Sequence, residues 1–265
     1  MARKLAIVAD AILQVGNGRG PDVLALQEVE NVRILERLRR DHLKAAGYRE
    51  PVLIEGNDAR GIDVAFLTRL PLAAPPALHP IAFDDDVPAV RVADTRGILE
   101  AVFRLPDGQL LTGYAVHFPA PFHPTAMRVA AYRALNALLA GLPPARPAFA
   151  AGDFNTTSAE DRREHLLQRL VRPDWVVAHE LGCGADCRGT SYYARDDSWS
   201  FLDMLLWSPA RRGADATWAI RADSVRLVNE HPGQRRDDGT PARFEPAGGP
   251  GVSDHWPLMM TIEPD

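Results

Sequence analysis

Apolar side chains recur every three or four residues in three stretches of the chain, and this spacing predicts three amphipathic helices. The glycine-rich turn that begins at Gly16 ends the first of them. Asn31 is a typical residue before the first turn of a helix, and Gly47 is a typical stop. Ser158 is predicted to cap a shorter fourth helix. The three longer helices are predicted at residues 3–13, 31–46 and 125–139.

Short runs of branched apolar and aromatic residues, separated by glycine, proline and aspartate, predict the strands. The clearest pair is a hairpin around the turn Pro106-Asp107-Gly108, whereas the proline-rich segment 71–88 is predicted to be a surface loop. Helices and strands interleave, yet several neighbouring strands are joined as hairpins, and this order favours a layered α/β sandwich over a purely parallel sheet. Strands are predicted at residues 23–26, 52–54, 64–67, 98–105, 110–116, 148–151, 201–207, 225–229 and 258–262.

Polar side chains able to do chemistry lie next to three of these strands. Glu28 follows the first strand, Asp153 and Asn155 follow a strand in the middle of the chain, and Asp254 and His255 precede the last strand. Loops at the ends of strands commonly build active sites on a rigid sheet. A site that draws on all of these residues requires them to meet in space.

One further carboxylate stands inside a predicted strand. Asp203 is flanked by apolar residues in segment 201–207. Burying a carboxylate without a partner costs on the order of several kcal/mol. We therefore expect Asp203 to have a cation or an imidazole as its partner.

Size and charge narrow the class of protein. The chain has 265 residues, enough for a large core, and we expect one domain over residues 1–265 because the polar stretches span its start, middle and end. Its formal net charge is -5, which argues against a basic nucleic-acid-binding scaffold. An enzyme that holds its phosphate through a divalent cation needs less overall basicity, because the ion supplies the strongest local positive charge.

The two cysteines leave the cellular location open. Cys183 and Cys187 lie in a glycine-containing loop, where they either close a small disulfide ring or stay as reduced thiols. A disulfide indicates an oxidising compartment, periplasmic or secreted, and would require a signal sequence that this chain does not show. No apolar run approaches the length that spans a bilayer, so we expect a soluble protein with no transmembrane segment.

The acidic groups fit the hydrolysis of a phosphoester with the help of a metal ion. Phosphoesters resist hydrolysis because water is a poor nucleophile and the phosphate repels it, and a divalent ion and a base relieve both problems. Magnesium prefers oxygen ligands and needs only one or two protein carboxylates. Glu28 is the first choice as its ligand, and Asp254 would serve the metal or its water shell.

The remaining polar residues suit acid-base work. Asp153 is placed to orient or deprotonate water, and Asn155 could bond the phosphate or the water without adding negative charge. His255 is the natural titratable group, and Asp203 would fix its tautomer and favour its protonated form.

Three residues keep two interpretations each. His117 ends an apolar strand, where it either faces the phosphate or is a half-buried structural histidine. Arg60 precedes another strand in a glycine-containing loop, where it either binds phosphate or is solvated. Asp63 has a similar pair of interpretations.

Several of these segments resemble the ordered motifs of the endonuclease/exonuclease/phosphatase superfamily, and the likeness to its bacterial, deoxyribonuclease-like members covers nearly the whole chain. The resemblance implies a four-layered α/β sandwich, with two mixed β-sheets packed face to face and helices outside, and dependence on Mg²⁺ or Mn²⁺. The motifs are Pro21-Asp22-Val23-Leu24-Ala25-Leu26-Gln27-Glu28-Val29, Gly152-Asp153-Phe154-Asn155, Leu202-Asp203-Met204-Leu205 and Ser253-Asp254-His255-Trp256-Pro257.

The same resemblance implies a role for each site residue. It assigns Glu28 to the metal, with Asp254 beside it, and Asp203 and His255 to an acid-base pair. It also assigns water and phosphate to Asp153 and Asn155 and a place at the phosphate to His117. The segment from Arg60 to Asp63 matches a pattern of bacterial members whose role it does not define.

One departure from the family pattern affects stability. Family members usually open with a strand that carries an asparagine near the metal, and this chain shows no such strand before the helix at residues 3–13. We therefore expect a fold that lacks the usual first strand, with weakened metal binding and reduced stability.

The function that follows is a divalent-metal-dependent hydrolase of phosphoesters, with a nuclease or other phosphodiesterase as the first choice and a nucleic acid as one possible substrate. The alternatives are a lipid or inositol-phosphate phosphoesterase of the same fold, and a catalytically silent binding module. We expect the protein to be a monomer.

Overall fold

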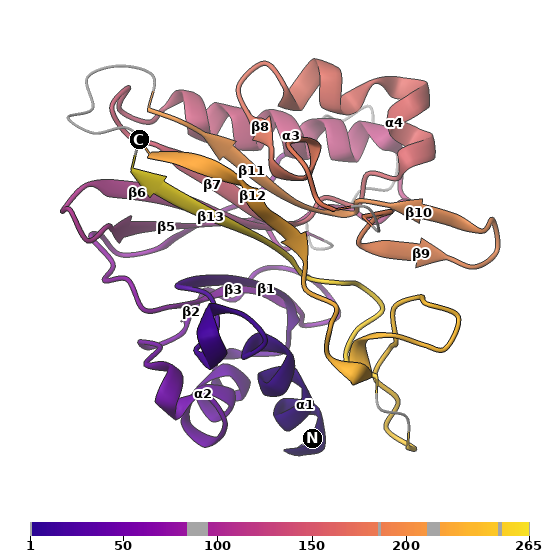
Figure 1. The fold of residues 1–265 in the computed structure, drawn as a ribbon. Helices are drawn as coiled ribbons and strands as arrows, with labels where there is room; N and C mark the ends of the chain where they lie inside the picture. The colour runs from indigo at the N-terminus through magenta and orange to yellow at the C-terminus, as the bar shows by residue number, and fades with distance from the viewer. Residues whose placement is uncertain (1, 84–94, 185–186, 211–217, 249–250, 265) are drawn as a thin grey trace.

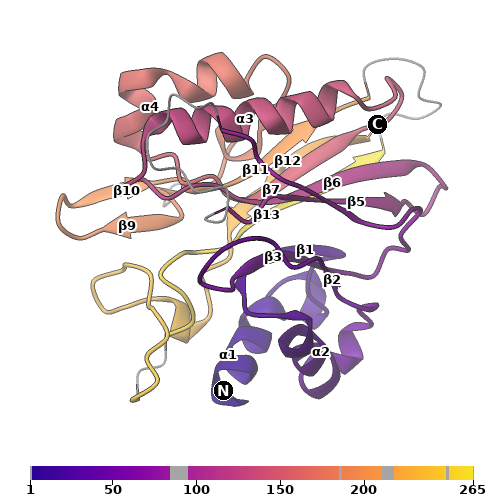
Figure 2. The ribbon, with the colours of Figure 1, turned by 180° about the vertical axis from the view of Figure 1, so that it is seen from behind.

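The strands lie in the middle of the molecule and the helices on its two outer sides (Figures 1 and 2). The computed structural model describes residues 2–83, 95–184, 187–210, 218–248 and 251–264. Its α-helices are α1 (Ala2–Ile12), α2 (Val32–Asp41), α3 (Thr125–Ala140) and α4 (Ser158–Glu164). Shorter helical segments cover Gly16–Gly18, Lys44–Ala46, Leu167–Val171, Ala178–Glu180 and Pro232–Gln234.

The largest sheet has six strands and is mixed. They are β4 (Ala77–His79), β5 (Ile98–Arg104), β6 (Leu110–His117), β7 (Ala148–Asp153), β8 (Val176–Val177) and β11 (Asp203–Ser208). The strand order is β4-β5-β6-β7-β11-β8, with β6 and β7 parallel and the other pairs antiparallel. Helices α3 and α4 cover one face of this sheet (Figure 1).

The second layer of strands consists of two antiparallel sheets. One contains β1 (Val23–Val29), β2 (Val52–Leu53) and β3 (Asp63–Thr68), in the order β1-β3-β2. The other pairs β12 (Trp218–Leu227) with β13 (Leu258–Pro264). From the sequence we expect this layer to lack one strand. Among the described residues, the layer consists of two separate sheets rather than one. A separate hairpin of β9 (Ser191–Tyr193) and β10 (Ser198–Ser200) projects from one end of the molecule.

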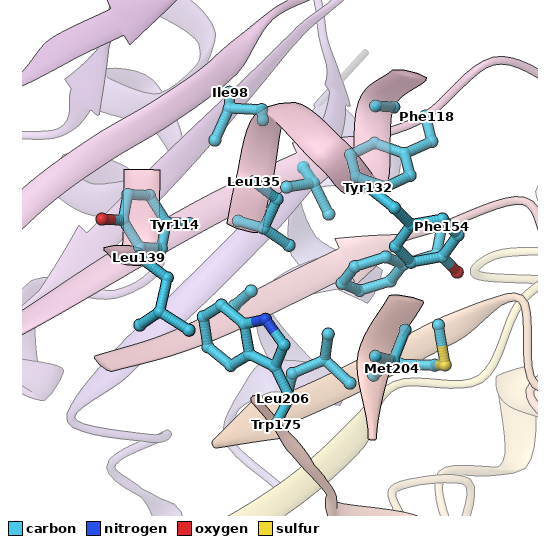
Figure 3. Close-up of a cluster of buried hydrophobic side chains, with 14 of the residues drawn as sticks. Ile98, Tyr114, Phe118, Tyr132, Leu135, Leu139, Phe154, Trp175, Met204 and Leu206 are labelled. Atoms are coloured by element: carbon cyan, nitrogen blue, oxygen red, sulfur yellow. The ribbon is translucent and has the colours of Figure 1, made fainter. Parts of the chain in front are cut away.

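Three clusters of buried side chains separate the four layers, and they confirm the predicted sandwich. The first lies between α3 and the six-stranded sheet, where Tyr132 and Leu135 pack with Tyr114 and Phe154 (Figure 3). The second fills the space between the two strand layers and contains Phe66, which packs against two more phenylalanine rings. The third holds α1 and α2 against β1 and β3.

Several predicted boundaries differ from the structure. Helix α2 ends at Asp41 rather than at residue 46, because the chain turns at His42 and this turn buries Leu43 and Ala46. Strand β4 lies inside the segment predicted as a loop, residues 71–88, whose last five residues lie outside the described ranges. Strand β12 begins at Trp218 and not near residue 225.

The cap of α4 is also one residue earlier than predicted. The hydroxyl of Thr157, not that of Ser158, accepts a hydrogen bond of 3.1 Å from the backbone N–H of Glu160. The Ser158 hydroxyl instead donates to the carbonyl of Trp199. Local spacing allowed either residue, and the contact with β10 decides between them.

Two observations bear on the cellular location. Cys183 and Cys187 form a disulfide, with their Cα atoms 5.4 Å apart, which is one of the two states that the sequence left open. Among the described residues, no helix is both long enough and apolar enough to cross a membrane. The compartment stays a prediction.

Candidate catalytic site

Three of the predicted site residues form a row across the six-stranded sheet. His117 ends β6 and is in register with Asp153, which ends the parallel strand β7. Asp153 is in turn directly opposite Asp203, the first residue of β11. Side chains directly opposite each other on neighbouring strands have Cβ atoms about 5 Å apart. The sheet register therefore brings together residues that are far apart in the sequence.

His255 joins this row from the segment before β13. Its Nδ1 donates a hydrogen bond of 2.7 Å to Oδ2 of Asp203, which confirms the expected partner of the in-strand carboxylate. An isolated bridge to Ser191 fixes the backbone of His255 at the base of the projecting hairpin. Asp254, next to it, is exposed.

The charges in this cluster depend on one another. Burial, and then the charge of Asp203, raises the pKa of Asp153. Burial alone would lower the pKa of His255, but the charge and hydrogen bond of Asp203, together with Asp153, raise it to about 10. The cluster therefore holds a protonated imidazole against the carboxylate of Asp203 at neutral pH.

The second histidine has the opposite character. Burial lowers the pKa of His117 to about 2, and the positive charges of Arg96 and Arg60 add to the effect. Its Nε2 lies 3.5 Å from Oδ2 of Asp153. His117 is thus a neutral hydrogen-bonding group rather than a source of charge.

Asn155 is held by two contacts just beyond β7. Its backbone N–H donates to Oδ1 of Asp153 at 2.8 Å, and its Nδ2 donates to the carbonyl of Phe118 at 2.9 Å. Its φ of 52° is in the left-handed region, which asparagine adopts more readily than most residues. These bonds fix the turn that follows Asp153.

Glu28 is placed by a bulge in β1, not by the end of the strand as predicted. The strand continues to Val29, and its register with β3 shifts between Leu26 and Val29. Glu28 has a φ of 56° and is exposed. A bulge turns a side chain to a new direction, which a sequence pattern does not reveal. The Nε2 of neighbouring Gln27 lies 3.0 Å from the position that a Cβ on Gly152 would take, so Gln27 packs against the strand that carries the row, whereas Glu28 is not part of the cluster of Asp153, Asp203 and His255.

Sequence reasoning missed a buried ion pair behind His117. Nη2 of Arg96 lies 3.0 Å from Oδ2 of Asp58, and both side chains are almost fully buried. Nη1 of Arg96 donates to the carbonyl of His117 at 3.2 Å. Burial lowers the pKa of Arg96, against the charges of Asp58 and Glu28. Arg96 stands two residues before the apolar strand β5, and this position was the available signal.

Arg60 and Asp63 lie beside this ion pair and outside the row. The Arg60 side chain is exposed, 3.5 Å from a carboxylate oxygen of Asp58. Asp63 begins β3, accepts a hydrogen bond from the backbone of Gly56, and has its pKa raised by burial. Arg60 is thus available to a ligand, whereas Asp63 supports the loop.

Sequence reasoning also missed the aromatic hairpin. Tyr192 and Trp199 face each other across β9 and β10, and their ring centroids are 5.2 Å apart. Trp199 in turn lies 5.1 Å from Trp256, and the guanidinium of Arg235 stands over that ring. The alternation of polar and aromatic residues around a turn of aspartates was the available signal. The result is a series of rings next to His255.

The cluster suits a divalent cation by its donor set. The carboxylates of Asp153 and Asp203 and the ring of His255 have candidate ligand atoms within 4.8 Å of one another, but the imidazole of His255 is protonated, so the two carboxylates are the donors that suit a cation. Burial and the charge of Asp203 both raise the pKa of Asp153, so its carboxylate would gain from positive compensation. A cation would provide it.

Comparison with known protein families gives one match. The model described as "Endonuclease/Exonuclease/phosphatase family" matches residues 1–255. No curated protein matches the chain to a significant degree.

Solved structures resemble the chain over almost its whole length. A family protein from Leptotrichia buccalis has 16% identity and a TM-score of 0.69, over 99% of this chain and 93% of that one. D. rerio TDP2 complexed with a single strand DNA product has 19% identity and a TM-score of 0.67, over 98% and 92%. The human Nocturnin catalytic domain with bound sulfate has 15% identity and a TM-score of 0.62, over 97% and 86%. At these identities the likeness shows the fold.

Proposed function

Because the chain belongs to the endonuclease/exonuclease/phosphatase family, we propose that it is a divalent-metal-dependent phosphodiesterase that cleaves nucleic acid. Members of this family are hydrolytic enzymes that depend on divalent metal ions. The observation that supports the proposal most is the cluster of Asp153, Asp203 and His255, with its 2.7 Å bond between the last two.

The metal site is proposed from the oxygen donors around this cluster. Glu28 and Asp254 would hold Mg²⁺ or Mn²⁺ together with water and the carboxylate row, since both ions prefer oxygen ligands. A bound divalent ion would neutralise charge on the phosphate and on the attacking water. The exposure of Glu28 and Asp254 leaves their oxygens open to an ion.

The chain's own residues then supply proton transfer and orientation. Asp153, with its raised pKa, accepts a proton from the attacking water as the water oxygen bonds to phosphorus. His255, protonated and oriented by Asp203, donates a proton to the leaving oxygen as the P–O bond breaks. Asn155 and neutral His117 bond the phosphate oxygens, and exposed Arg60 contributes positive charge to substrate binding.

The aromatic hairpin favours a nucleic acid as substrate. Bases stack on aromatic side chains, and each such contact contributes about 1–3 kcal/mol to binding. Tyr192 and Trp199 offer partly exposed rings, and buried Trp256, which has Arg235 over its ring, packs against Trp199 and follows His255 in the chain. This arrangement suits unpaired bases next to a phosphodiester.

The test measures hydrolysis of methyl p-nitrophenyl phosphate and of a labelled oligonucleotide with Mg²⁺, Mn²⁺ or Ca²⁺ and with EDTA. We expect cleavage of both that EDTA abolishes. Asp153→Asn and His255→Ala should each lower kcat at least about 100-fold. Asp10→Asn, an exposed aspartate of α1, is the matched control and should retain activity.

The outcomes separate the alternatives. Full activity in both site variants would contradict the assignment of the catalytic residues. Hydrolysis confined to lipid or inositol phosphates would favour the phosphoesterases of those substrates. Wild-type protein that is inactive with every ion but still binds the oligonucleotide would favour a silent binding module.

A further inference from the structure

One large aromatic side chain is held almost entirely in solvent close to the site. Phe122 is 84% exposed, more than any other large hydrophobic residue in the described part of the chain. Its ring packs against the ring of His123, with the two centroids 4.2 Å apart. An exposed phenylalanine does not contribute the stabilising free energy that its burial would, so this exposure needs a physical explanation.

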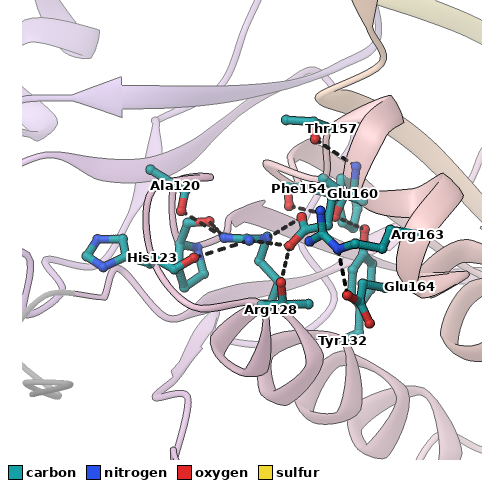
Figure 4. A network of polar contacts seen from close by, with 12 residues as sticks. Ala120, His123, Arg128, Tyr132, Phe154, Thr157, Glu160, Arg163 and Glu164 are labelled. Atoms are coloured by element: carbon teal, nitrogen blue, oxygen red, sulfur yellow. Dashed lines mark hydrogen bonds and ion pairs between the residues drawn. The ribbon is translucent and has the colours of Figure 1, made fainter. Parts of the chain in front are cut away.

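The loop that carries Phe122 is fixed from its inner side. The guanidinium of buried Arg128 donates to the carbonyls of Pro119, Ala120 and His123, at 3.2, 2.8 and 3.3 Å (Figure 4). The same guanidinium pairs through two hydrogen bonds with buried Glu160 of α4. Prolines at positions 119, 121 and 124 restrict the loop further. The backbone is therefore ordered before any ligand arrives, and Phe122 faces outward from it.

This loop is continuous with the catalytic cluster. It follows Phe118, whose carbonyl accepts the hydrogen bond from Asn155. The four residues from Phe118 to Phe122 span at most about 14 Å. On the other side, Ser158 at the start of α4 bonds to Trp199 and Ser200 of the aromatic hairpin. The Phe122 loop, the start of α4 and the hairpin thus form one rim beside the site.

A hollow of about 390 Å³ lies between the loop and α4. Its walls offer the ring of Phe122, the hydroxyls of Thr125 and Thr157, and the side chain of Arg163, which is 63% exposed. A flat apolar face next to hydroxyls and a guanidinium suits a ligand that joins an aromatic ring to an anion. A nucleotide has this composition, and the hollow has the volume of a small-molecule site.

We propose that this hollow is a second binding subsite, in which Phe122 stacks on a base of the nucleic acid and Arg163 contacts its phosphate. The subsite rests on the proposed function, since it takes the part of the strand that leads away from the scissile phosphate. Its rigid loop lowers the ordering cost of binding. It also makes the enzyme prefer oligonucleotide strands to small phosphodiesters as substrates.

The test compares Phe122→Ala and Phe122→Trp with wild type. Binding of a labelled single-stranded oligonucleotide is followed by fluorescence anisotropy in EDTA, so that it does not depend on catalysis. We expect Phe122→Ala to weaken binding about 5- to 150-fold and to raise KM for the oligonucleotide while kcat changes less. Phe122→Trp should restore both values. Leu181→Ala, which removes another exposed apolar side chain, is the matched control.

Three results would overturn the subsite. The first is an oligonucleotide affinity that Phe122→Ala leaves unchanged. The second is an equal loss of kcat/KM for the oligonucleotide and for methyl p-nitrophenyl phosphate, because this would indicate a structural effect. The third is a selective loss of binding to anionic phosphatidylserine vesicles, which would assign Phe122 to a membrane surface. If the wild-type protein hydrolyses no diester, the proposed function is refuted. If it does hydrolyse diesters and Phe122→Ala leaves oligonucleotide binding unchanged, only the subsite is refuted.

Discussion

At the scale of single residues, the site depends on neighbours that change the proton affinity of its side chains. Asp203 and His255 are 52 positions apart in the sequence, and their hydrogen bond keeps the imidazole charged well above neutral pH. His117, on the same sheet, is kept neutral by burial. Two histidines of one site thus have opposite charge states, because His255 makes a 2.7 Å hydrogen bond to Asp203, whereas for His117 burial and the nearby arginines outweigh the Asp153 carboxylate 3.5 Å away.

Asp203→Asn should shift the pH dependence of catalysis. The pKa of His255 is raised to about 10 by Asp203 and Asp153, so its acid form persists to high pH in the wild type. Removing the charge of Asp203 lowers that pKa, and the alkaline limb of kcat/KM should move down by about 1–3 pH units. Rates with the small diester between pH 6 and 10.5 measure the shift. Asp223→Asn, an exposed aspartate of β12, should leave the limb in place. An unmoved limb in Asp203→Asn would refute the coupling.

His117→Asn should reduce the sensitivity of the fold to acid. The folded pKa of His117 is about 2, far below the value of 6.5 for a free imidazole. Below pH 6.5 the unfolded chain therefore binds a proton that the folded protein does not, and stability falls with pH by about 1.4 kcal/mol per unit. Between pH 7.5 and 5.0, wild type should lose about 2 kcal/mol more than His117→Asn.

Urea unfolding at the two pH values, with EDTA present, measures this difference. His42→Asn is the control variant, and it should lose as much stability in acid as wild type does. Equal acid losses in wild type and His117→Asn would mean that the folded protein takes up the proton at this residue.

At the scale of strands and helices, close backbone contacts decide where the site residues stand. Gly152 precedes Asp153 on β7 and has a φ of 143°, a conformation that other residues rarely adopt. A Cβ at this position would lie 2.0 Å from the carbonyl oxygen of Val116 on β6. Only glycine lets the two parallel strands approach closely enough to align His117 with Asp153.

Gly152→Ala should therefore destabilise the protein strongly. The clash involves backbone on both sides and cannot be relieved by a side-chain movement, so we expect a loss of at least about 3 kcal/mol. Urea denaturation measures it. Gly141→Ala is the control, since Gly141 has a φ of -75° and ample space, and its change should be near zero or slightly stabilising. A Gly152→Ala protein as stable as wild type would refute the close approach.

Glu160→Gln should loosen the connection between the Phe122 loop and α4. It leaves buried Arg128 with an uncompensated charge, which typically costs about 3–5 kcal/mol. Glu164→Gln on the same helix breaks only the exposed pair with Arg163 and should cost less than about 1 kcal/mol. Thermal and urea unfolding of both variants test the difference. Similar losses in the two would show that burial of the pair has no energetic consequence.

At the scale of the whole molecule, four layers bring distant segments to one end of the sheets. The cluster combines β7, β11 and the segment before β13, and the second strand layer, which carries Glu28 on β1, packs on the six-stranded sheet. The net charge is -5, so the protein as a whole repels a polyanion and binding depends on a few local cations.

Oligonucleotide binding should consequently show a weak dependence on salt. With two to four cations at the rim, the slope of log Kobs against log salt should be about -1 to -3. Arg163→Gln should reduce the slope by about 0.7, whereas Arg40→Gln on the outer helix α2 should not. Anisotropy titrations from 50 to about 300 mM salt measure this. A slope steeper than about -6 would indicate a basic surface that the present charge distribution does not contain.

Much of the architecture and the site could be predicted, and the failures have physical causes. The partner of Asp203 followed from the cost of burying a carboxylate, and the β5–β6 hairpin followed from its turn. The bulge at Glu28, the end of α2 and the Asp58–Arg96 pair could not, because each depends on what packs against it. The role of the predicted metal ligands stays a prediction.

The amino-acid sequence alone determined the helices, most strands, the layered sandwich and the residue types of the site. These properties follow from local periodicity, because each helix or strand must bury one face whatever its neighbours are. Only the tertiary structure decided which groups meet: the register of β6, β7 and β11 aligned His117, Asp153 and Asp203, and the path of the loop at His255 closed the cluster. Contacts between residues distant in sequence depend on register and chain path, which local spacing does not encode.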